Sequence, residues 1–342
     1  MGIHEVAKRA KVSTATVSRT LNKPGTVDPE TAKRVWKAVK ELQYLPNTTA
    51  RSLVSGSTRI LGLIVSDITN PFFPEVIKGL EDVAIREGYE ILISSTNYDL
   101  ARMAVCVRRM LERKVDGVAI MTSELEKHLI DELDRRNVPM VFMDVGPVTA
   151  NISNVRIDYQ QGINEAVQHL LALGHRRIGF LSGPLDLKSA RVRRTAFLRG
   201  LARFGVIEDE RLVEAGNHKI DGGLQAMTRL LALSEPPTAV LASNDLTAFG
   251  AMRAVRMVGL RVPEDVSIIG FDDIQLAEFT EPPLTTVRLP RSVLAERAFE
   301  ALTTHINAKK TGSPTRGAEY LVGTELVVRG TTAVKRVDMI VR

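Results

Sequence analysis

Apolar residues follow two different spacings along the chain, helical near the N-terminus and strand-like further on. The apolar residues of the stretch IHEVAKRA recur at the i, i+3, i+4, i+7 spacing of one helix face. Ser13 is a good N-cap for a second short helix over residues 14–21, in which Val17 and Leu21 face inward. Two short helices joined by a tight turn are the plan of a helix-turn-helix.

A third helix is expected to begin at the Asp-Pro pair that follows this motif. Asp28 can serve as its N-cap and Pro29 suits its first position. Its apolar stripe includes Val35 and Trp36. Three helices of this size bury little area, and we expect Trp36 to help close one small core between them.

The polar face of the second helix is a candidate DNA-reading surface. In a helix-turn-helix, this helix enters the major groove and presents its N-terminal side chains to base edges. Arg19 suits a bidentate contact to guanine, whereas Ala15 can offer only a methyl group. The residues expected at the DNA are Ser13, Thr14, Ala15, Thr16, Ser18, Arg19 and Asn22.

From residue 59 onward, apolar strand patterns alternate with helix patterns, and the second half repeats the order of the first. The expected strands cover 59–65, 89–94, 115–121, 138–143, 177–182, 238–242 and 266–270. Strands separated by helices form parallel sheets that are covered on both faces. The sequence therefore predicts a core of two similar α/β lobes.

Polar residues stand directly after several predicted strands. Asp144, Asn244 and Asp272 each follow such a strand within two residues. In open parallel sheets, ligands bind beyond the carboxyl ends of the strands. If the two lobes face one another, these side chains come together in one cleft.

Positive charge is concentrated in the predicted helical segment. Residues 1–59 contain eleven Lys and Arg against four Asp and Glu, while the formal net charge of the whole chain is only +6. Such a field suits a phosphate backbone. The chain has no apolar run near the ~18 residues of a membrane span and opens without the apolar core of a secretory signal. We therefore expect a cytoplasmic protein that does not contact a membrane.

Sequence motifs for catalysis and for cofactors are missing. No two glycines stand two positions apart and no glycine precedes a lysine, which excludes the dinucleotide and P-loop fingerprints. The single Cys106 cannot form an internal disulfide or a multi-cysteine metal site. We expect neither an enzyme, nor a cofactor, nor a metal. A sugar-binding transport protein would share the two-lobed body, but it would lack the basic segment.

Six stretches of the chain resemble the lactose-repressor family of bacterial transcription regulators. They are EVAKRAKVSTATVSRTLN, YLPNTTARSLVSGSTRILGLIVSD, GHRRIGFLSGP, AVLASNDLTAFGAM, VPEDVSIIGFDD and PPLTTV. The resemblance implies a repressor that binds a palindromic double-stranded operator as a homodimer. A small molecule, expected to be a sugar or a sugar derivative, would control it from between the core lobes.

The same resemblance implies the domain organisation. The helix-turn-helix headpiece would cover residues 1–46, a hinge helix and linker 47–57, and the effector-binding and dimerisation core 58–342. The N-lobe would comprise about 58–157 and 289–318, and the C-lobe about 158–288 and 319–335. The core would be similar to periplasmic sugar-binding proteins, with parallel sheets in both lobes.

Individual roles also follow from the resemblance. Leu53 matches a hinge-helix leucine that wedges into the minor groove, where Asn47 and Arg51 would also contact DNA. The positions that match effector contacts are Asn70, Phe72, Phe73, Asp144, Ser189, Arg193, His218, Asn244, Asp272 and Leu289.

Two of these positions depart from the family pattern. His218 stands where many relatives have Trp or Phe, and Leu289 where some have a polar contact. The pattern around Asn70 is similar to ribose-type binding proteins, which favours a monosaccharide or a nucleoside. A purine-type effector, and corepression in place of induction, remain open alternatives.

Overall fold

The computed structural model describes residues 2–22, 25–45, 56–122 and 125–336 of the chain. These residues form two compact units, Met1–Thr58 and Arg59–Arg342, which we describe one at a time. Asn47, Arg51 and Leu53, and with them most of the expected hinge helix, lie outside the described residues.

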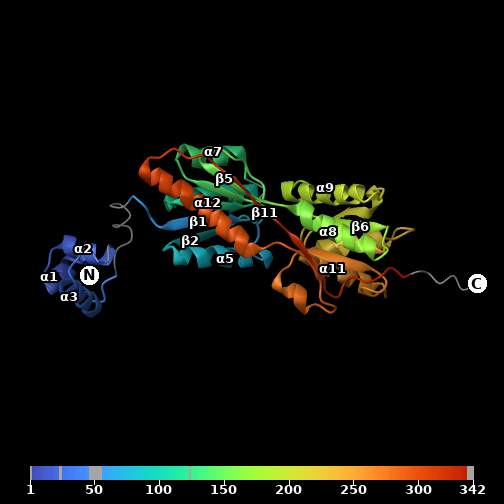
Figure 1. The fold of residues 1–342 in the computed structure, drawn as a ribbon, viewed down its shortest axis with the longest axis horizontal. Helices are drawn as coiled ribbons and strands as arrows, with labels where there is room; N and C mark the ends of the chain where they lie inside the picture. Colours follow the sequence, from blue (N-terminus) through green and yellow to red (C-terminus); the bar gives the residue numbers. More distant parts are fainter. Residues whose placement is uncertain (1, 23–24, 46–55, 123–124, 337–342) are drawn as a thin grey trace, which may run out of the picture. The chain divides into compact units, whose positions relative to one another are not determined.

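The first unit is a headpiece of short helices, drawn in blue in Figure 1. They are α1 (Ile3–Ala10), α2 (Thr14–Asn22) and α3 (Pro29–Glu41). The predicted caps begin two of them. The Ser13 hydroxyl accepts the Thr16 N–H at 3.1 Å, and the Asp28 carboxylate accepts the N–H of Glu30 at 3.0 Å. The helix-turn-helix prediction is confirmed.

The headpiece core consists of small aliphatic side chains. Val6, Val17 and Val35 are fully buried, one from each helix. The prediction for Trp36 is wrong, because 52% of this residue is exposed. Successive helix residues point about 100° apart. Val35 and Ala38 therefore take the inward direction and turn Trp36 toward solvent.

The second unit is the core, and its N-lobe is built on a parallel sheet. In the described residues the strand order is β11 (Glu319–Val322), β5 (Ile152–Ile157), β4 (Met140–Met143), β3 (Gly117–Met121), β1 (Ile60–Val65) and β2 (Glu90–Ser95). Its helices are α5 (Phe72–Arg86), α6 (Leu100–Glu112), α7 (Lys127–Arg135) and α12 (Arg291–Thr311).

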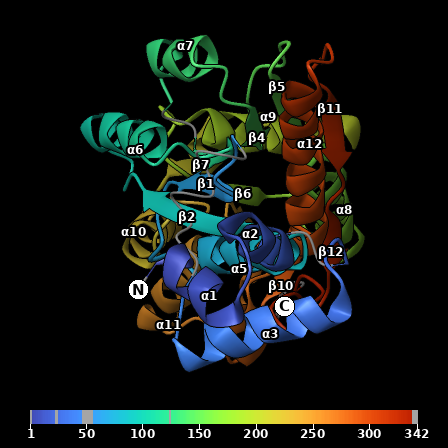
Figure 2. The ribbon, with the colours of Figure 1, turned by 90° about the vertical axis from the view of Figure 1, so that its left-hand side faces the viewer.

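Helices cover both faces of this sheet, as predicted. Leu63 of β1 packs in the cluster with α5 and α12, while its neighbour Ile64 packs with α6 and α7. Figure 2 shows α6 and α7 on one side of the strands and α12 on the other. Cys106 of α6 is a buried core residue. Strand β1 is apolar throughout because neither face of the sheet meets water there.

The C-lobe repeats this plan. Its strand order is β12 (Glu325–Val327), β10 (Thr285–Arg288), β9 (Ser267–Asp272), β8 (Ala239–Ala242), β6 (Ile178–Ser182) and β7 (Val213–Ala215). Its helices are α8 (Tyr159–Ala172), α9 (Lys188–Arg203), α10 (Ile220–Leu231) and α11 (Asp245–Met257), with the 3-10 turns η1 (Glu210–Leu212) and η2 (Gln275–Phe279). The edge strand β12 runs antiparallel to β10, and the other pairs are parallel.

Within the described residues the chain crosses between the lobes after β5, after β10 and between β11 and β12. The predicted boundary at residue 318 is therefore wrong. Strand β11 pairs in parallel with β5, from Glu319 opposite Asn154 to Val322 opposite Ile157. Residues 319–322 thus belong to the N-lobe, because the chain adds an edge strand there before it crosses. None of the described helices is long and apolar enough to cross a membrane.

Candidate functional site

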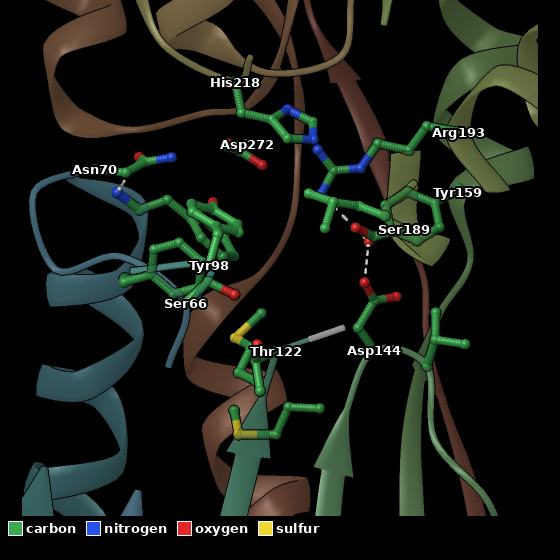
Figure 3. A pocket seen from close by; sticks show the side chains of 16 residues that line it. Ser66, Asn70, Tyr98, Thr122, Asp144, Tyr159, Ser189, Arg193, His218 and Asp272 are labelled. Atoms are coloured by element: carbon green, nitrogen blue, oxygen red, sulfur yellow. Dashed lines mark hydrogen bonds between the residues drawn. The ribbon is translucent and has the colours of Figure 1, made fainter. Parts of the chain in front are cut away.

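A cavity lies where the two lobes of the core meet, and Figure 3 shows it from close by. Strands β1, β3, β4 and β9 point their carboxyl ends at it, as expected for open parallel sheets. Its volume of about 60 Å³ is several times the ~10–15 Å³ that one water molecule needs. The N-lobe lines it with Ser66, Asn70, Phe72, Phe73, Tyr98, Met121, Thr122, Met143, Asp144 and Val145, and the C-lobe with Tyr159, Leu187, Ser189, Arg193, His218 and Asp272.

The first turn of α5 supplies an aromatic wall. Asn70 accepts the backbone N–H of Phe72 at 3.0 Å, which fixes the start of the helix. The rings of Phe72 and Phe73 meet edge to face with centroids 5.3 Å apart, and both residues are buried. Such a wall can cover the apolar C–H surface of a ligand.

A chain of polar contacts joins the two lobes at the cavity. The Tyr159 hydroxyl donates to Asp144 Oδ2 at 2.8 Å, and Arg193 Nη2 donates to the same hydroxyl at 3.3 Å. Arg193 Nη1 also donates to the Ser243 carbonyl at 2.6 Å. The guanidinium lies over the rings of Tyr159 and Phe271 at 4.9 and 5.0 Å. Arg193 is therefore held in one pose beside Asp144.

Two carboxyl groups in the cavity are strongly desolvated. Burial raises the pKa of Asp144 to about 6 and that of Asp272 to about 7, although the Arg193 charge acts in the opposite direction on both. Asp144 Oδ1, Asp272 Oδ1 and Arg193 Nε are buried and have no hydrogen-bond partner among the described residues. Asp144, Asp272 and Arg193 all line the cavity, which therefore offers acceptors from both lobes and a cationic donor.

His218 forms the top of the cavity in Figure 3, next to Arg193. Its Nδ1 lies 3.3 Å from Ser243 Oγ. Burial, together with the Arg193 charge, lowers the pKa of His218 to about 3, so the imidazole is neutral at pH 7. The ring packs directly on Gly183, where an added Cβ would lie 1.9 Å from His218 Nε2. His218 therefore contributes a polar, uncharged ring to the wall of the cavity.

The structure brings eight of the ten expected effector positions to the cavity, and Asn244 and Leu289 do not line it. Asn244 Oδ1 caps α11 by accepting the Thr247 N–H at 2.9 Å, and its Nδ2 donates to the His218 carbonyl at 2.9 Å. Asn244 thus fixes the backbone of His218 and does not itself line the cavity. Leu289 is fully buried in the apolar core. The expectation that polar residues directly after predicted strands line the cleft, here called the strand-end rule, therefore did not distinguish the helix cap Asn244 from a cavity residue.

Some cavity residues were not predicted. Thr122 follows β3, so it carries the strand-end signal that pointed to Asp144. Tyr159 opens α8 and follows β5 within two residues, but the sequence patterns did not predict that strand. In the part of the chain that the structure describes, no group of three His, Cys, Asp or Glu side chains could hold a metal ion.

The headpiece presents the expected DNA-reading residues on and around α2. Arg19 Nε donates to the Ala15 carbonyl at 3.4 Å, and Asn22 Nδ2 donates to the Ser18 carbonyl at 2.9 Å. The Ser13 and Thr16 hydroxyls lie 2.9 Å apart. Ser13, Ala15, Arg19 and Asn22 are exposed, and Thr14, Thr16 and Ser18 are half-buried.

Comparisons with known proteins cover both units. The family described as bacterial regulatory proteins, lacI family, matches residues 2–47, and a periplasmic binding protein-like domain matches residues 167–332. The HTH-type transcriptional repressor PurR of Aliivibrio salmonicida is 36% identical over 308 residues, which are 90% of this chain and 92% of that protein.

Solved structures resemble most or nearly all of the chain. The lac repressor dimer bound to operator and the anti-inducer ONPF has a TM-score of 0.83 at 29% identity, over 97% of this chain and 99% of that one. A LacI family transcriptional regulator from Enterococcus faecium with bound ribose has a TM-score of 0.71 at 28% identity, over 81% of this chain and 100% of that one. The headpiece and the two-lobed core therefore recur together in the lac repressor, whereas the Enterococcus faecium structure matches a smaller share of this chain.

Proposed function

Because the chain belongs to the lacI family of bacterial regulatory proteins, it is a DNA-binding transcription regulator and not an enzyme, and we propose that a sugar controls its operator affinity. The sugar, or a sugar derivative, would bind in the cavity between the core lobes. A ligand that prefers one relative orientation of the lobes shifts the equilibrium toward it. We favour induction, in which the bound effector lowers operator affinity.

The observation that carries this proposal is the set of polar side chains that line the cavity. The carboxyl groups of Asp144 and Asp272 can accept hydroxyl groups, and the Arg193 guanidinium can donate to a ring or hydroxyl oxygen. Phe72 and Phe73 can cover the C–H face of the same ligand. The ribose bound to the similar Enterococcus faecium regulator supports a ligand of this class.

A nucleoside- or purine-type effector is the alternative. The edge-to-face pair of Phe72 and Phe73 also suits a planar base, and the neutral His218 can hydrogen-bond to a base edge. A sugar without a base would use the two carboxylates but would leave part of this aromatic wall uncovered. The two classes therefore differ in which wall of the cavity carries the binding energy.

Calorimetry separates these possibilities. D-ribose, adenosine and hypoxanthine are titrated into the protein, and the class that gives a saturable heat identifies the effector. Arg193→Ala should abolish that heat, because it removes the cation that both carboxylates face. Operator affinity in a mobility-shift assay should stay near the unmodified value. Arg199→Ala, an exposed position on the same helix, is the control. Unchanged binding in Arg193→Ala would overturn the assignment of the cavity.

We place DNA recognition on α2 of the headpiece. Thr14, Ala15 and Arg19 would read base edges in the major groove, and Arg19 can bind guanine through two hydrogen bonds. A bidentate contact of this kind is worth ~1–3 kcal/mol of discrimination. Arg19→Ala should therefore relax sequence preference at one operator position in each half-site.

We further propose that the protein binds a palindromic operator as a homodimer. The similar lac repressor is a dimer bound to operator. On the C-lobe, Phe279 and Met257 are 75% and 68% exposed beside a groove that Phe249 and Met252 help to line. Exposed apolar patches next to a groove mark interaction surfaces. A second copy of the chain would cover this patch, and Phe279→Asp should weaken dimerisation in sedimentation experiments.

A further inference from the structure

Glu75 and Arg291 form an ion pair on the N-lobe, at the ends of two tightly packed helices. Arg291 Nε lies 2.8 Å from Glu75 Oε2. One helical turn further on, α5 and α12 approach so closely that a Cβ added at Gly79 would lie 3.2 Å from Ala295 Cβ. The pair is therefore built on a rigid base within one lobe.

The remaining hydrogen-bonding groups of this pair reach across to the C-lobe backbone. Arg291 Nη1 donates to the Asp272 carbonyl at 2.5 Å, and Nη2 donates to the Asp273 carbonyl at 2.8 Å. Glu75 Oε1 accepts the N–H of Gln275 at 3.1 Å. Both side chains thus form charge-assisted hydrogen bonds with the backbone of the segment around the end of β9.

The gripped segment has an unfavourable backbone. Asp272 and Asp273 have φ angles of +117° and +55°, a region that residues other than glycine seldom adopt. Such conformations persist only where the surroundings hold them. The Asp273 carboxylate is fixed by Arg288 and Arg329, each at 2.7 Å, from within its own lobe. The contacts of Arg291 supply the fixation from the other lobe.

We propose that Glu75 and Arg291 are positioning residues for the effector site and form an interlobe brace with the backbone of residues 272–275. The brace holds the Asp272 carboxylate in the cavity and fixes the angle at which the lobes close. This role rests on the proposed function, since it takes the cavity to be the effector site. Neither side chain lines the cavity. Both therefore act through Asp272 and through the lobe arrangement in which the brace is formed, which we call the closed state.

Loss of the brace should lower effector affinity by reducing the population of the closed state. The apparent affinity of a ligand falls in proportion to the fraction of protein that is competent to bind it. Arg291→Met keeps most of the aliphatic stem but removes the N–H groups that donate to the two backbone carbonyls. Glu75→Ala removes the carboxylate that orients Arg291 and accepts the Gln275 N–H. Glu75→Gln keeps neutral acceptor and donor atoms and should be affected less.

D-ribose is the probe for the first measurement, by calorimetry with the full-length protein. Arg291→Met and Glu75→Ala should each weaken binding by about tenfold or more, as expected when charge-assisted hydrogen bonds are lost. The double variant should lose little more than either single variant, because the two residues act as one unit. Arg297→Met is the matched control on α12, since Arg297 pairs with Glu300 at 2.7 Å on the exposed face.

A second measurement needs no ligand. Spin labels at Arg135→Cys on α7 and Gln225→Cys on α10 report the distance between the lobes, in a Cys106→Ala background with labelled subunits diluted by unlabelled ones. Unmodified protein should give one narrow distribution, and removal of either brace residue should broaden it toward longer distances. The control variant should not.

The outcomes separate the two proposals. An unchanged distance distribution in Arg291→Met and Glu75→Ala refutes the brace, whatever ligand binds. If D-ribose fails to bind even the unmodified protein while the distributions broaden, the sugar proposal fails and the brace stands. If Glu75→Ala does not fold, Arg291→Met alone carries the test, and a distribution identical to that of the unmodified protein then counts against the brace.

Discussion

Replacing Asp272 with asparagine should stabilise the protein at neutral and alkaline pH. The Asp272 residue is only 3% exposed, and its Oδ1 has no hydrogen-bond partner among the described residues. Burial raises the pKa of Asp272 to about 7, against the opposing charges of Arg193 and Arg291. Asparagine has nearly the same shape and carries no charge, so the substitution removes the cost of burying a carboxylate.

The sign and size of the effect follow from the difference in proton affinity. The folded protein binds this proton more tightly than the unfolded chain, where aspartate has the ordinary pKa of 3.8. The free energy of unfolding therefore falls as the pH rises from about 4 to about 7, and it levels off above the folded pKa. Each tenfold change in proton affinity is worth ~1.4 kcal/mol, so the full cost at pH 8 is about 4 kcal/mol. Burial and the neighbouring Asp272 charge both raise the pKa of Asp245. The substitution removes that neighbouring charge and so also removes its repulsion with Asp245.

Urea unfolding followed by circular dichroism at pH 5 and pH 8, at one protein concentration, measures this difference. The stability gained by Asp272→Asn should be about 2–3 kcal/mol larger at pH 8 than at pH 5. Asp131→Asn, at an exposed position of α7, should give no such pH dependence. Equal gains at the two pH values for Asp272→Asn would refute the reasoning. The stabilised variant should also lose effector affinity, since it gives up a carboxylate acceptor.

Three further changes test other parts of the molecule. Gly183→Ala should displace the His218 ring, because the new Cβ would lie 1.9 Å from Nε2, and calorimetry should then show effector binding weakened by about tenfold or more. Asp28→Ala removes the N-cap of α3 and should destabilise the headpiece by ~1 kcal/mol without changing the core transition in scanning calorimetry, because the two units are separately compact. Leu53→Ala should weaken operator binding strongly in a mobility-shift assay and leave dimerisation unchanged in sedimentation, if Leu53 is the minor-groove wedge that the family resemblance implies.

The strand-end rule explains how much of the site was predictable. Asp144 and Asp272 follow buried apolar strands, and a parallel sheet brings the ends of such strands to one edge. The rule also selected Asn244, which caps a helix behind His218. A strand end and a helix start coincide at that position, and local sequence does not state which way a side chain turns.

Partners that lie on different secondary-structure elements were not predictable in the same way. Tyr159 bridges Asp144 and Arg193, and Arg291 grips the backbone of Asp272, yet none of these pairs has a local pattern. The exposure of Trp36 belongs to the same class of result, since a large apolar residue on a helix can face either the core or a partner. Only the packing of neighbouring elements decides between the two.

The sequence by itself determined the local order of this protein. Helical spacing with cap residues predicted the headpiece helices, and short apolar runs between helices predicted seven of the twelve described strands. Those patterns are local, because hydrogen bonding and burial of one face depend on neighbours within a few residues. The tertiary structure alone decided the extra edge strand at 319–322, the desolvation of the cavity carboxylates and the contacts between the lobes. Each of these depends on groups that lie on different secondary-structure elements or on the exclusion of water, and neither condition leaves a periodic trace in the chain.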